Sequence, residues 1–436
     1  MHCSRTAFHS RGFEVSIERA DIVVVGAGAA GLFAAIWAAR TNRGLRVVAV
    51  DGAKTLGAKI LVAGGGRCNV THHAVHTSDY SGSTPALIDR VLRRFQVEDT
   101  IEFFERQGVT LKREATGKLF PTTDRARSVL DALLAAAREV GVQLLHPMRI
   151  DSVKECDGGF LIEGASGSIT TQRVILSTGG LSLPKSGSDG AGLRMAESLE
   201  HSATSLIHPA LVPLTLAPDH WLTALSGLAV PAAISVAGGD GKSVRERTGR
   251  PLQSIHGAVL CTHFGLSGPA ILDVSRHWLQ AKSSDAGAHL LINWLPGSTA
   301  QSLDQELTAL KGTSLLGALR ARLPERFLRA ACGVAGVDGT CGIQQLTRDK
   351  RHTFTHLVCS NVVHPTGSRG FAAAETTAGG VPLSQLNLEQ LESLHCRGLF
   401  MCGEMLDVDG RLGGFSFQWA WSSGFVAGTS AARSLT

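Results

Sequence analysis

The sequence predicts an α/β fold made of two or three packed units, and three observations lead to it. With 436 residues, the chain exceeds the size of one ordinary domain. A strand, a glycine-rich turn, a helix and a second strand follow one another over residues 21–51, and the order strand, glycine turn, helix recurs over residues 398–433. Between about residues 190 and 363, prolines, glycine turns and alternating apolar runs indicate a β-rich insertion.

The N-terminal pattern is that of a βαβ unit. Residues 21–25 are an apolar, β-branched run, which is typical of a parallel strand buried on both faces. Residues 29–40 are alanine-rich and helical, and residues 45–50 form a second apolar strand that stops at Asp51. We therefore expect two parallel strands joined by one helix.

The turn of this unit matches the dinucleotide-binding fingerprint. Gly26 makes the tight turn, Gly28 lets the backbone approach a pyrophosphate, and Gly31 lets helix and strand pack closely. Asp51 can accept hydrogen bonds from ribose hydroxyls and repels a 2′-phosphate, which favours FAD or NAD over NADP. The alternative is a tight turn in an unrelated protein. The predicted contacts here are Gly26, Gly28, Ala29, Ala30, Gly31, Asp51 and Gly52.

Three further segments favour FAD, because its second half extends past the first βαβ unit. The stretch from Lys59 to Asn69 holds three successive glycines, which let backbone amides approach a flat ligand, and two side chains that donate hydrogen bonds. A flexible surface loop is the alternative there. Residues 178–180 follow an expected strand and consist of small residues, and Glu404 follows another strand, where its carboxylate could meet ribityl hydroxyls.

Four separated motifs resemble a bacterial family of NAD(P)/FAD-dependent oxidoreductases that includes BaiN-like reductases and aminoacetone oxidase-like enzymes. The resemblance covers roughly residues 20–432. In many members a Glu stands where this chain has Asp51. The motifs are Lys59 to Thr71, Thr178 to Ser188, Thr262 to Ala270 and Gly403 to Ala420.

The resemblance implies a glutathione-reductase-type (two-dinucleotide-binding) FAD domain, built from both chain ends, with an inserted β-barrel-like domain and a helical sub-insertion. It also implies that the Gly64 to Asn69 loop and the Gly403 to Gln418 region border FAD. Beyond the βαβ unit, the expected FAD contacts are Lys59, Gly64, Gly65, Gly66, Arg67, Cys68, Asn69, Thr178, Gly179, Gly180, Gly403, Glu404, Asp409, Gly413, Gly414, Phe415 and Gln418.

These patterns suggest a division of the chain into a leader and three units. Residues 1–19 lack the apolar run of a signal peptide and are expected to be a disordered leader. The other expected units are an FAD-binding domain over 20–190 and 364–436, a β-rich domain over 191–275 and 341–363, and a helical sub-domain over 276–340.

Composition limits the classes of partner and compartment. A net charge of +5 is mild for 436 residues, and no basic stripe with interleaved aromatics occurs, so nucleic acid is not an expected partner. Nine cysteines at irregular spacings favour a reducing compartment, with the cytoplasm as the expected location. Apolar runs are strand-length, so no membrane span is expected.

Few side chains suggest chemistry of their own. Cys68 is either a redox thiol beside the flavin or a small apolar filler. The histidines at 72, 73 and 76 have no carboxylate or thiolate spaced to complete a site, so no metal is predicted. Arg411 either faces the ligand or pairs with Asp407 or Asp409. No catalytic residue is assigned.

The expected function is that of an FAD-dependent oxidoreductase acting on a small molecule. The reaction is either reduction of an activated C=C bond or oxidation of an amine, and the electron donor stays open. NAD(P)H is a candidate transient donor, although no second Gly-x-Gly-x-x-Gly lies in a βαβ setting. Two alternative hypotheses are an FAD-dependent tRNA-modifying or RNA-binding protein and a flavin-binding regulator without turnover.

Overall fold

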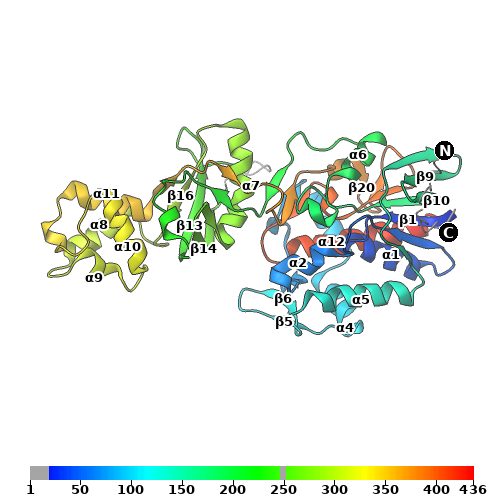
Figure 1. The fold of residues 1–436 in the computed structure, drawn as a ribbon, viewed down its shortest axis with the longest axis horizontal. Helices are drawn as coiled ribbons and strands as arrows, with labels where there is room; N and C mark the ends of the chain where they lie inside the picture. Colours follow the sequence, from blue (N-terminus) through cyan, green and yellow to red (C-terminus); the bar gives the residue numbers. More distant parts are fainter. Residues whose placement is uncertain (1–18, 246–251) are drawn as a thin grey trace, which may run out of the picture.

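The computed structural model describes residues 19–245 and 252–436 (Figure 1). Three parts follow one another along its longest axis: a large α/β domain, a β-rich middle part and a group of short helices at the far end. The leader expected over residues 1–19 lies outside the described residues except for Arg19, which begins strand β1.

A nine-stranded sheet with a parallel centre forms the middle of the large domain. The strand order is β20-β21-β22-β10-β1-β2-β7, and β8 and β9 extend the sheet beside β10. β1 lies between β10 and β2, so both of its edges are hydrogen-bonded, and its valines are buried on both faces of the sheet, as the sequence predicted. The strands are β1 (Arg19–Val25), β2 (Val47–Val50), β7 (Gln143–Leu145), β8 (Ser152–Cys156), β9 (Gly159–Gly164), β10 (Gly167–Leu176), β20 (Leu386–Asn387), β21 (Glu392–Ser393) and β22 (Leu399–Met401).

The first and last helices of the large domain, α1 and α12, lie side by side (Figure 1, blue and red). Gly428 of α12 makes this approach possible, because a Cβ there would lie 2.2 Å from the carbonyl oxygen of Ala34. The two chain ends therefore share one core. The helices of this domain are α1 (Ala29–Thr41), α2 (Ala58–Gly66), α3 (Pro85–Leu92), α4 (Val97–Arg106), α5 (Ala126–Glu139), α6 (Ala191–Ser198) and α12 (Phe415–Arg433).

Short ladders attach further segments to the large domain. The first ladder places β6 beside α2 and α5. The second joins the segment before α12 to residues 80–82. The third lies where the connections to the middle part begin. Their strands are β3 (Thr71–His72), β5 (Leu111–Arg113) and β6 (Lys118–Pro121), then β4 (Tyr80–Gly82) and β23 (Val408–Gly410), then β11 (His208–Ala210) and β19 (Thr376–Ala378).

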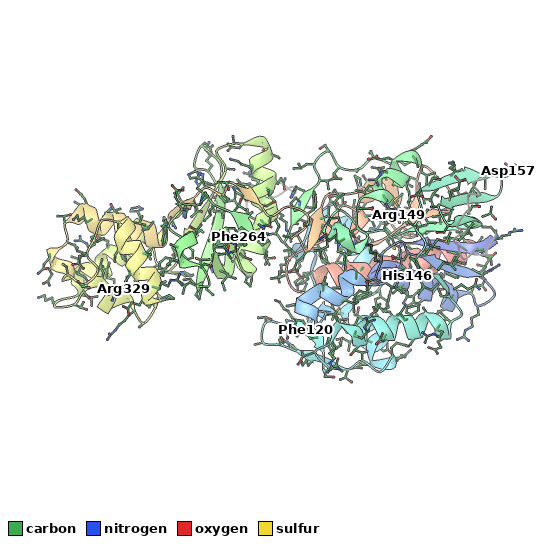
Figure 2. All side chains as sticks on the ribbon, viewed as in Figure 1. Phe120, His146, Arg149, Asp157, Phe264 and Arg329 are labelled. Carbon is green, nitrogen blue, oxygen red and sulfur yellow. The ribbon has the colours of Figure 1, made fainter. Side chains whose placement is uncertain are left out.

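The middle part and the helices at the far end share one hydrophobic core, which runs from Leu214 to Val363 and is separate from the core of the large domain. Seven strands pair in the order β17-β16-β13-β14-β15-β12-β18, all antiparallel, and α7 (Pro269–Ser284) packs on β13 and β14. Phe264 marks this part in Figure 2. The strands are β12 (Leu214–Thr215), β13 (Ala229–Ala237), β14 (Ile255–Thr262), β15 (Gly265–Ser267), β16 (His289–Asn293), β17 (Asn361–Val363) and β18 (Gly367–Ser368).

The far end of the molecule consists of four helices, and Arg329 in Figure 2 lies on one of them. Gly312 and Pro324 lie between successive helices there. The helices are α8 (Ala300–Ala309), α9 (Leu315–Leu319), α10 (Glu325–Val334) and α11 (Arg348–Cys359). Within the residues that the structure describes there are also six 3₁₀ turns: Thr77–Asp79, Pro184–Ser186, Thr223–Leu225, Ile343–Gln345, Leu383–Gln385 and Gly403–Met405.

Two of the expected boundaries need correction. The helical sub-domain was placed at 276–340, but α7 and β16 belong to the middle part, because the apolar face of α7 covers β13 and β14, and α11 extends the helices to Cys359. The β-rich domain was expected to begin at residue 191. Instead, α6 packs into the core of the large domain through Leu193, Met195 and Ala196.

Among the described residues, no helix combines the length and the apolar character needed to cross a bilayer.

Candidate functional site

A cavity of about 520 Å³ lies at the carboxyl ends of the parallel strands, which is where ligands of open α/β sheets bind. Segments far apart in the sequence contribute its walls. Most of the expected cofactor contacts line it: Gly26, Gly28, Ala29, Ala30, Asp51, Gly52, Lys59, Gly64, Gly65, Arg67, Asn69, Thr178, Gly179, Gly403, Glu404, Gly413 and Gly414.

The glycine turn after β1 forms one end of the cavity. Gly26 has a φ of 98°, and a Cβ there would lie 2.7 Å from the carbonyl oxygen of Ser177, so a side chain has no room. A Cβ on Gly28 would meet no atom within 4 Å, because it would point into the cavity. Asp51 accepts hydrogen bonds from the backbone N–H groups of Ala27 (2.7 Å) and Ala53 (2.8 Å), which hold its carboxylate beside the turn.

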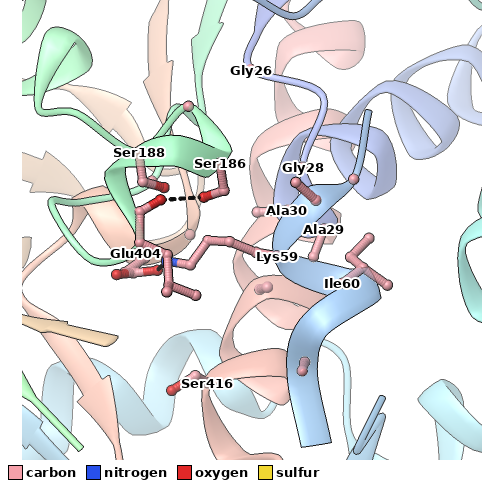
Figure 3. Close-up of a pocket in the computed structure, with 18 of the residues that line it drawn as sticks. Gly26, Gly28, Ala29, Ala30, Lys59, Ile60, Ser186, Ser188, Glu404 and Ser416 are labelled. Atoms are coloured by element: carbon pink, nitrogen blue, oxygen red, sulfur yellow. Dashed lines mark hydrogen bonds and ion pairs between the residues drawn. The ribbon is translucent and has the colours of Figure 1, made fainter. Parts of the chain in front are cut away.

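A four-residue network spans the middle of the cavity (Figure 3). Lys59 reaches from α2 to form an ion pair with Glu404, and it also donates to the hydroxyl of Ser182 at 2.7 Å. The second carboxylate oxygen of Glu404 accepts from Ser182 (2.6 Å) and from the N–H of Thr377 (3.0 Å). This network fixes four chain segments relative to one another, those that hold Lys59, Ser182, Thr377 and Glu404.

The glycine segment after α2 is a kink rather than a free loop. Gly64 and Gly65 have φ values of 56° and 69°, which only glycine adopts without strain, and the helix breaks there. Arg67 follows and lies 4.0 Å above the ring of Phe120, while its guanidinium pairs with Glu114 at 2.6 Å. The backbone at this kink is therefore open to the cavity and supported from behind.

Some of the expected contacts lie outside the cavity, and packing explains each of them. Gly31 faces the strand, because a Cβ there would lie 1.8 Å from the carbonyl oxygen of Gly26. Gly66 ends α2 away from the cavity, and Gly180 packs against Thr377. Cys68 is fully buried, and burial raises the pKa of its thiol to about 12, so a redox role is not supported.

The other three expected contacts outside the cavity interact with protein groups instead. Asp409 forms a buried ion pair with Arg276 of α7. The ring of Phe415 stacks on His72 at 4.9 Å. The side-chain oxygen of Gln418 accepts hydrogen bonds from two buried threonines, at positions 71 and 100, and therefore has no free group for a cofactor.

Three buried polar atoms along the cavity wall lack a hydrogen-bond partner in the described structure: Asn69 Oδ1, Thr178 Oγ1 and Ser416 Oγ. Unpaired buried polar atoms cost about 1–3 kcal/mol each, so their gathering at one cavity indicates a polar ligand. Together with the exposed N–H groups at the start of α1, they fit FAD, which offers phosphates, hydroxyls and a ring N–H.

The end of the cavity that lies against the middle part holds charged residues that sequence reasoning missed. Lys118 at the start of β6 and Glu375 just before β19 both line it. Arg411 also lines it, but pairs with Asp79 (2.6 Å) rather than with Asp407 or Asp409. Burial raises the pKa of Glu375, while the positive charge of Lys118 lowers it in part.

Other missed residues line the wall nearer the glycine turn. Ser186 and Ser188, labelled in Figure 3, belong to a motif that the resemblance included, so that motif could have identified them. Arg149 pairs with Asp189 at 2.8 Å and stands in no motif. Only the tertiary structure brings it to the site.

Contacts between α7 and the C-terminal segment hold the two parts of the molecule together at this end. Arg276 donates to the carbonyl oxygen of Asp409 at 2.9 Å in addition to the ion pair. The backbone N–H of Leu412 donates to Asp273 at 2.6 Å. Burial raises the pKa of Asp273, and the N–H of Leu412 and the charge of Arg276 oppose this rise.

Comparison with known proteins gives a family and full-length relatives. The model of the HI0933-like protein Rossmann domain matches residues 20–430. The ribosomal RNA dihydrouridine synthase of Escherichia coli is 32% identical over 413 residues, covering 94% of this chain and 97% of the relative. Its namesake from Haemophilus influenzae is 30% identical, covering 94% and 98%.

A third full-length relative carries another name. The 3-dehydro-bile acid delta(4,6)-reductase of Clostridium scindens is 29% identical over 416 residues, covering 94% of this chain and 99% of the relative. The match over residues 20–430 includes the glycine turn, the kink after α2 and the C-terminal segment around the cavity. The chain therefore belongs to the HI0933-like Rossmann-domain family and is an FAD-dependent oxidoreductase.

Proposed function

We propose that this protein is an FAD-dependent reductase that saturates a C=C bond conjugated to a carbonyl group, with a uridine base of RNA as its first-choice substrate. The observation that carries this proposal is the charged end of the cavity, where a carboxyl and two cationic side chains gather. An acid and a positive charge are the groups that such a reduction requires at its carbonyl side. Oxidation of an amine calls for neither.

The cavity residues suit successive parts of FAD. Asp51 would hold the ribose of the adenosine, and the N–H groups at the start of α1 would hold the pyrophosphate. The kink at Gly64 and Gly65, with Asn69, would border the ring system. When bound, FAD takes up two electrons from a donor, for which we propose NAD(P)H, and passes them to the substrate as a hydride.

The names of the relatives support the class of reaction. Dihydrouridine is uridine with a saturated C5=C6 bond, and that bond is conjugated to the C4 carbonyl. Two relatives of at least 30% identity are named for its synthesis. The net charge of +5 has the sign that RNA binding requires. This choice departs from the sequence-based expectation that nucleic acid is not a partner.

A steroid-like enone is the second candidate substrate. The relative of 29% identity is named for reduction of a 3-dehydro-bile acid. Val62 of α2 supports this candidate, because its side chain lines the cavity and is 57% exposed, which offers an apolar surface. Both candidates share the conjugated C=C bond, so they differ in recognition and not in chemistry.

The test is an anaerobic experiment on the purified protein loaded with FAD. NADH and then NADPH are added while the flavin absorbance is followed, and the bleached protein is mixed with unmodified ribosomal RNA, with a steroid dienone or with buffer. We expect RNA to restore the absorbance and to gain dihydrouridine. A protein that takes up no FAD, or one that only oxygen reoxidises, would overturn the proposal.

Two outcomes would select the rivals. Bleaching by an amine in the absence of NAD(P)H would indicate an amine oxidase. Bound FAD that no donor or candidate substrate reduces would indicate a regulator without turnover.

A further inference from the structure

Glu375 occupies a distinctive place in the fold. It immediately precedes β19, and its N–H donates to the carbonyl oxygen of Leu211 at 3.2 Å, so it lies where both connections between the large domain and the middle part begin. The residue lines the cavity and is exposed to it, although protein surrounds it on the other sides. Its carboxyl therefore meets whatever occupies the cavity.

In the described part of the chain, the carboxyl of Glu375 forms no polar contact that stabilises the fold. Within residues 19–245 and 252–436, neither this carboxyl nor the ammonium of Lys118 makes a side-chain hydrogen bond or an ion pair. By contrast, Glu404 and Asp51 in the same cavity are held by several donors. A carboxyl and an ammonium group that are not paired with each other at a cavity end are available to a ligand.

The backbone of Glu375 is nevertheless fixed. Its N–H donates to the carbonyl oxygen of Leu211 at 3.2 Å, and the N–H of Thr377, two residues further on, donates to Glu404 at 3.0 Å. Glu404 is itself held by the hydroxyl of Ser182. The network that borders the expected cofactor thus also positions Glu375. A catalytic group needs this kind of rigid support relative to the reacting atoms.

We propose that Glu375 is the catalytic acid of this reductase and donates a proton to the substrate carbon that lies next to the carbonyl group. This inference rests on the proposed function. The hydride adds to the far carbon of the C=C bond, the π bond breaks, and the O–H proton of Glu375 forms the second new C–H bond. The substrate is thereby reduced by two electrons, NAD(P)H is oxidised, and water returns a proton to the carboxylate.

The surrounding charges suit this role. Lys118 from β6 and Asp273 from α7 act on Glu375 in opposite directions, since Lys118 lowers its pKa and Asp273 raises it. Burial is the largest influence and raises the pKa. Arg411 and Arg276 in turn face Asp273 and lower its pKa. The proton therefore stays on Glu375 to a higher pH than on a glutamate of the open outer surface.

The kinetic test compares Glu375→Gln with the wild type after anaerobic reduction of the bound cofactor. We expect unchanged FAD content and unchanged bleaching by NAD(P)H, but reoxidation by the C=C substrate slowed by about 10²- to 10⁴-fold, the usual contribution of a general acid. Glu375→Asp should recover part of the rate. Glu325→Gln on the exposed surface of α10 is the matched control and should keep the wild-type rate.

The position of solvent deuterium gives a readout that a merely structural role would not change. In D₂O, the wild type should place deuterium on one face of the carbon beside the carbonyl, because the donor is fixed. Any product of Glu375→Gln should carry deuterium on both faces, since free water would then be the donor. Equal stereochemistry in both proteins would contradict the inference.

Thermal unfolding gives a readout that is independent of turnover. A carboxyl with a raised folded-state pKa favours folding when protonated, and this stability is lost as pH rises from the unfolded pKa through the folded pKa. Glu375→Gln should therefore raise Tm relative to the wild type at neutral pH, and the difference should vanish near pH 4, the range of ordinary glutamates. A Tm difference that does not depend on pH would contradict this.

Two variants of neighbouring charges test whether the Tm difference comes from Glu375. Lys118→Met should move the pH midpoint of this Tm difference upward, and Asp273→Asn should move it downward, because the two charges act in opposite directions. If no C=C substrate reoxidises the wild type, the proposed function fails. If the substrate reoxidises the wild type and Glu375→Gln equally fast, only the assignment of Glu375 fails.

Discussion

The two ends of the cavity are built in different ways. At the glycine-turn end, Gly26, Gly28 and Asp51 come from one βαβ unit and are positioned by their own backbone. At the charged end, Lys118, Glu375 and Arg411 come from three distant segments and lie where two parts of the molecule meet. The first end depends on local geometry and the second on tertiary assembly, so the two ends should respond differently to mutation.

The largest effect should follow from breaking the ion pair that joins the two parts. Arg276 and Asp409 are buried, with side chains 5% and 1% exposed, and Arg276→Ala would leave a buried carboxylate without its partner. We expect a loss of about 3–5 kcal/mol in unfolding free energy. Substrate reduction should suffer more than FAD affinity, because the pair lies at the charged end. Denaturant unfolding and an FAD titration on the same samples measure both quantities.

The double variant Arg276→Met with Asp409→Leu is the control. Replacing both charges by apolar groups should recover much of the stability, because no buried charge then remains unpaired. If Arg276→Ala were as stable as the wild type, the junction would not depend on this pair.

At the glycine-turn end, two alanine substitutions should separate folding from binding. A Cβ on Gly31 would lie 1.8 Å from Gly26 O, so Gly31→Ala should destabilise the protein by about 3 kcal/mol and weaken FAD binding. Gly28→Ala meets no atom within 4 Å and has an ordinary φ of −77°, so it should retain stability while its methyl group enters the cavity and weakens FAD binding. Equal stability of the two variants would contradict the packing role of Gly31.

The contact with the adenosine ribose should depend on the carboxylate of Asp51. Asp51→Ala removes a charged acceptor that lines the cavity, and hydrogen bonds to charged groups contribute about 1.5–3 kcal/mol, so FAD affinity should fall about 10- to 100-fold. Asp51→Glu keeps the carboxylate and should bind FAD nearly as well. Fluorescence quenching of added FAD measures both affinities. An unchanged affinity of Asp51→Ala would show that the ribose does not bind at Asp51.

Cys68 should give the smallest effect, although it stands between two residues that line the cavity. Burial raises the pKa of its thiol to about 12, so the thiol stays neutral and unreactive at neutral pH. We expect no alkylation of Cys68 in the folded protein and full alkylation after unfolding, as read by peptide mass spectrometry. Rapid labelling of Cys68 in the native state would restore the redox alternative.

Sequence reasoning reached the glycine-turn end because its signals are local. The buried strand before Gly26, the helix after it and Asp51 at the next strand end all lie within one short segment, and the structure confirms these elements. The helix expected at the end of residues 398–433 is α12. Its Trp421 packs on Phe33 of α1 and Phe104 of α4, and its Trp419 lies near Tyr80 of β4.

The residues of the charged end could not be predicted from the sequence, for a physical reason. No local sequence pattern around Lys118 or Glu375 indicates that these residues line one cavity. The β3–β6 ladder brings Lys118 there, and the β11–β19 ladder brings Glu375 there. The same limit explains the errors at Asp409 and Gln418, whose polar side chains satisfy buried partners instead of facing a ligand. The helical sub-domain expected over 276–340 is wrong for the same reason, because no local signal indicates that α7 covers a sheet.

The stoichiometry of a single anaerobic turnover tests the proposed C=C reduction most directly. Protein loaded with FAD is reduced by one equivalent of NAD(P)H, freed of excess donor and mixed with unmodified ribosomal RNA. We predict that the flavin absorbance returns without oxygen and that one dihydrouridine forms for each flavin reoxidised. Absorbance that returns only when oxygen is admitted, with neither RNA nor a steroid dienone reduced, would contradict this proposal.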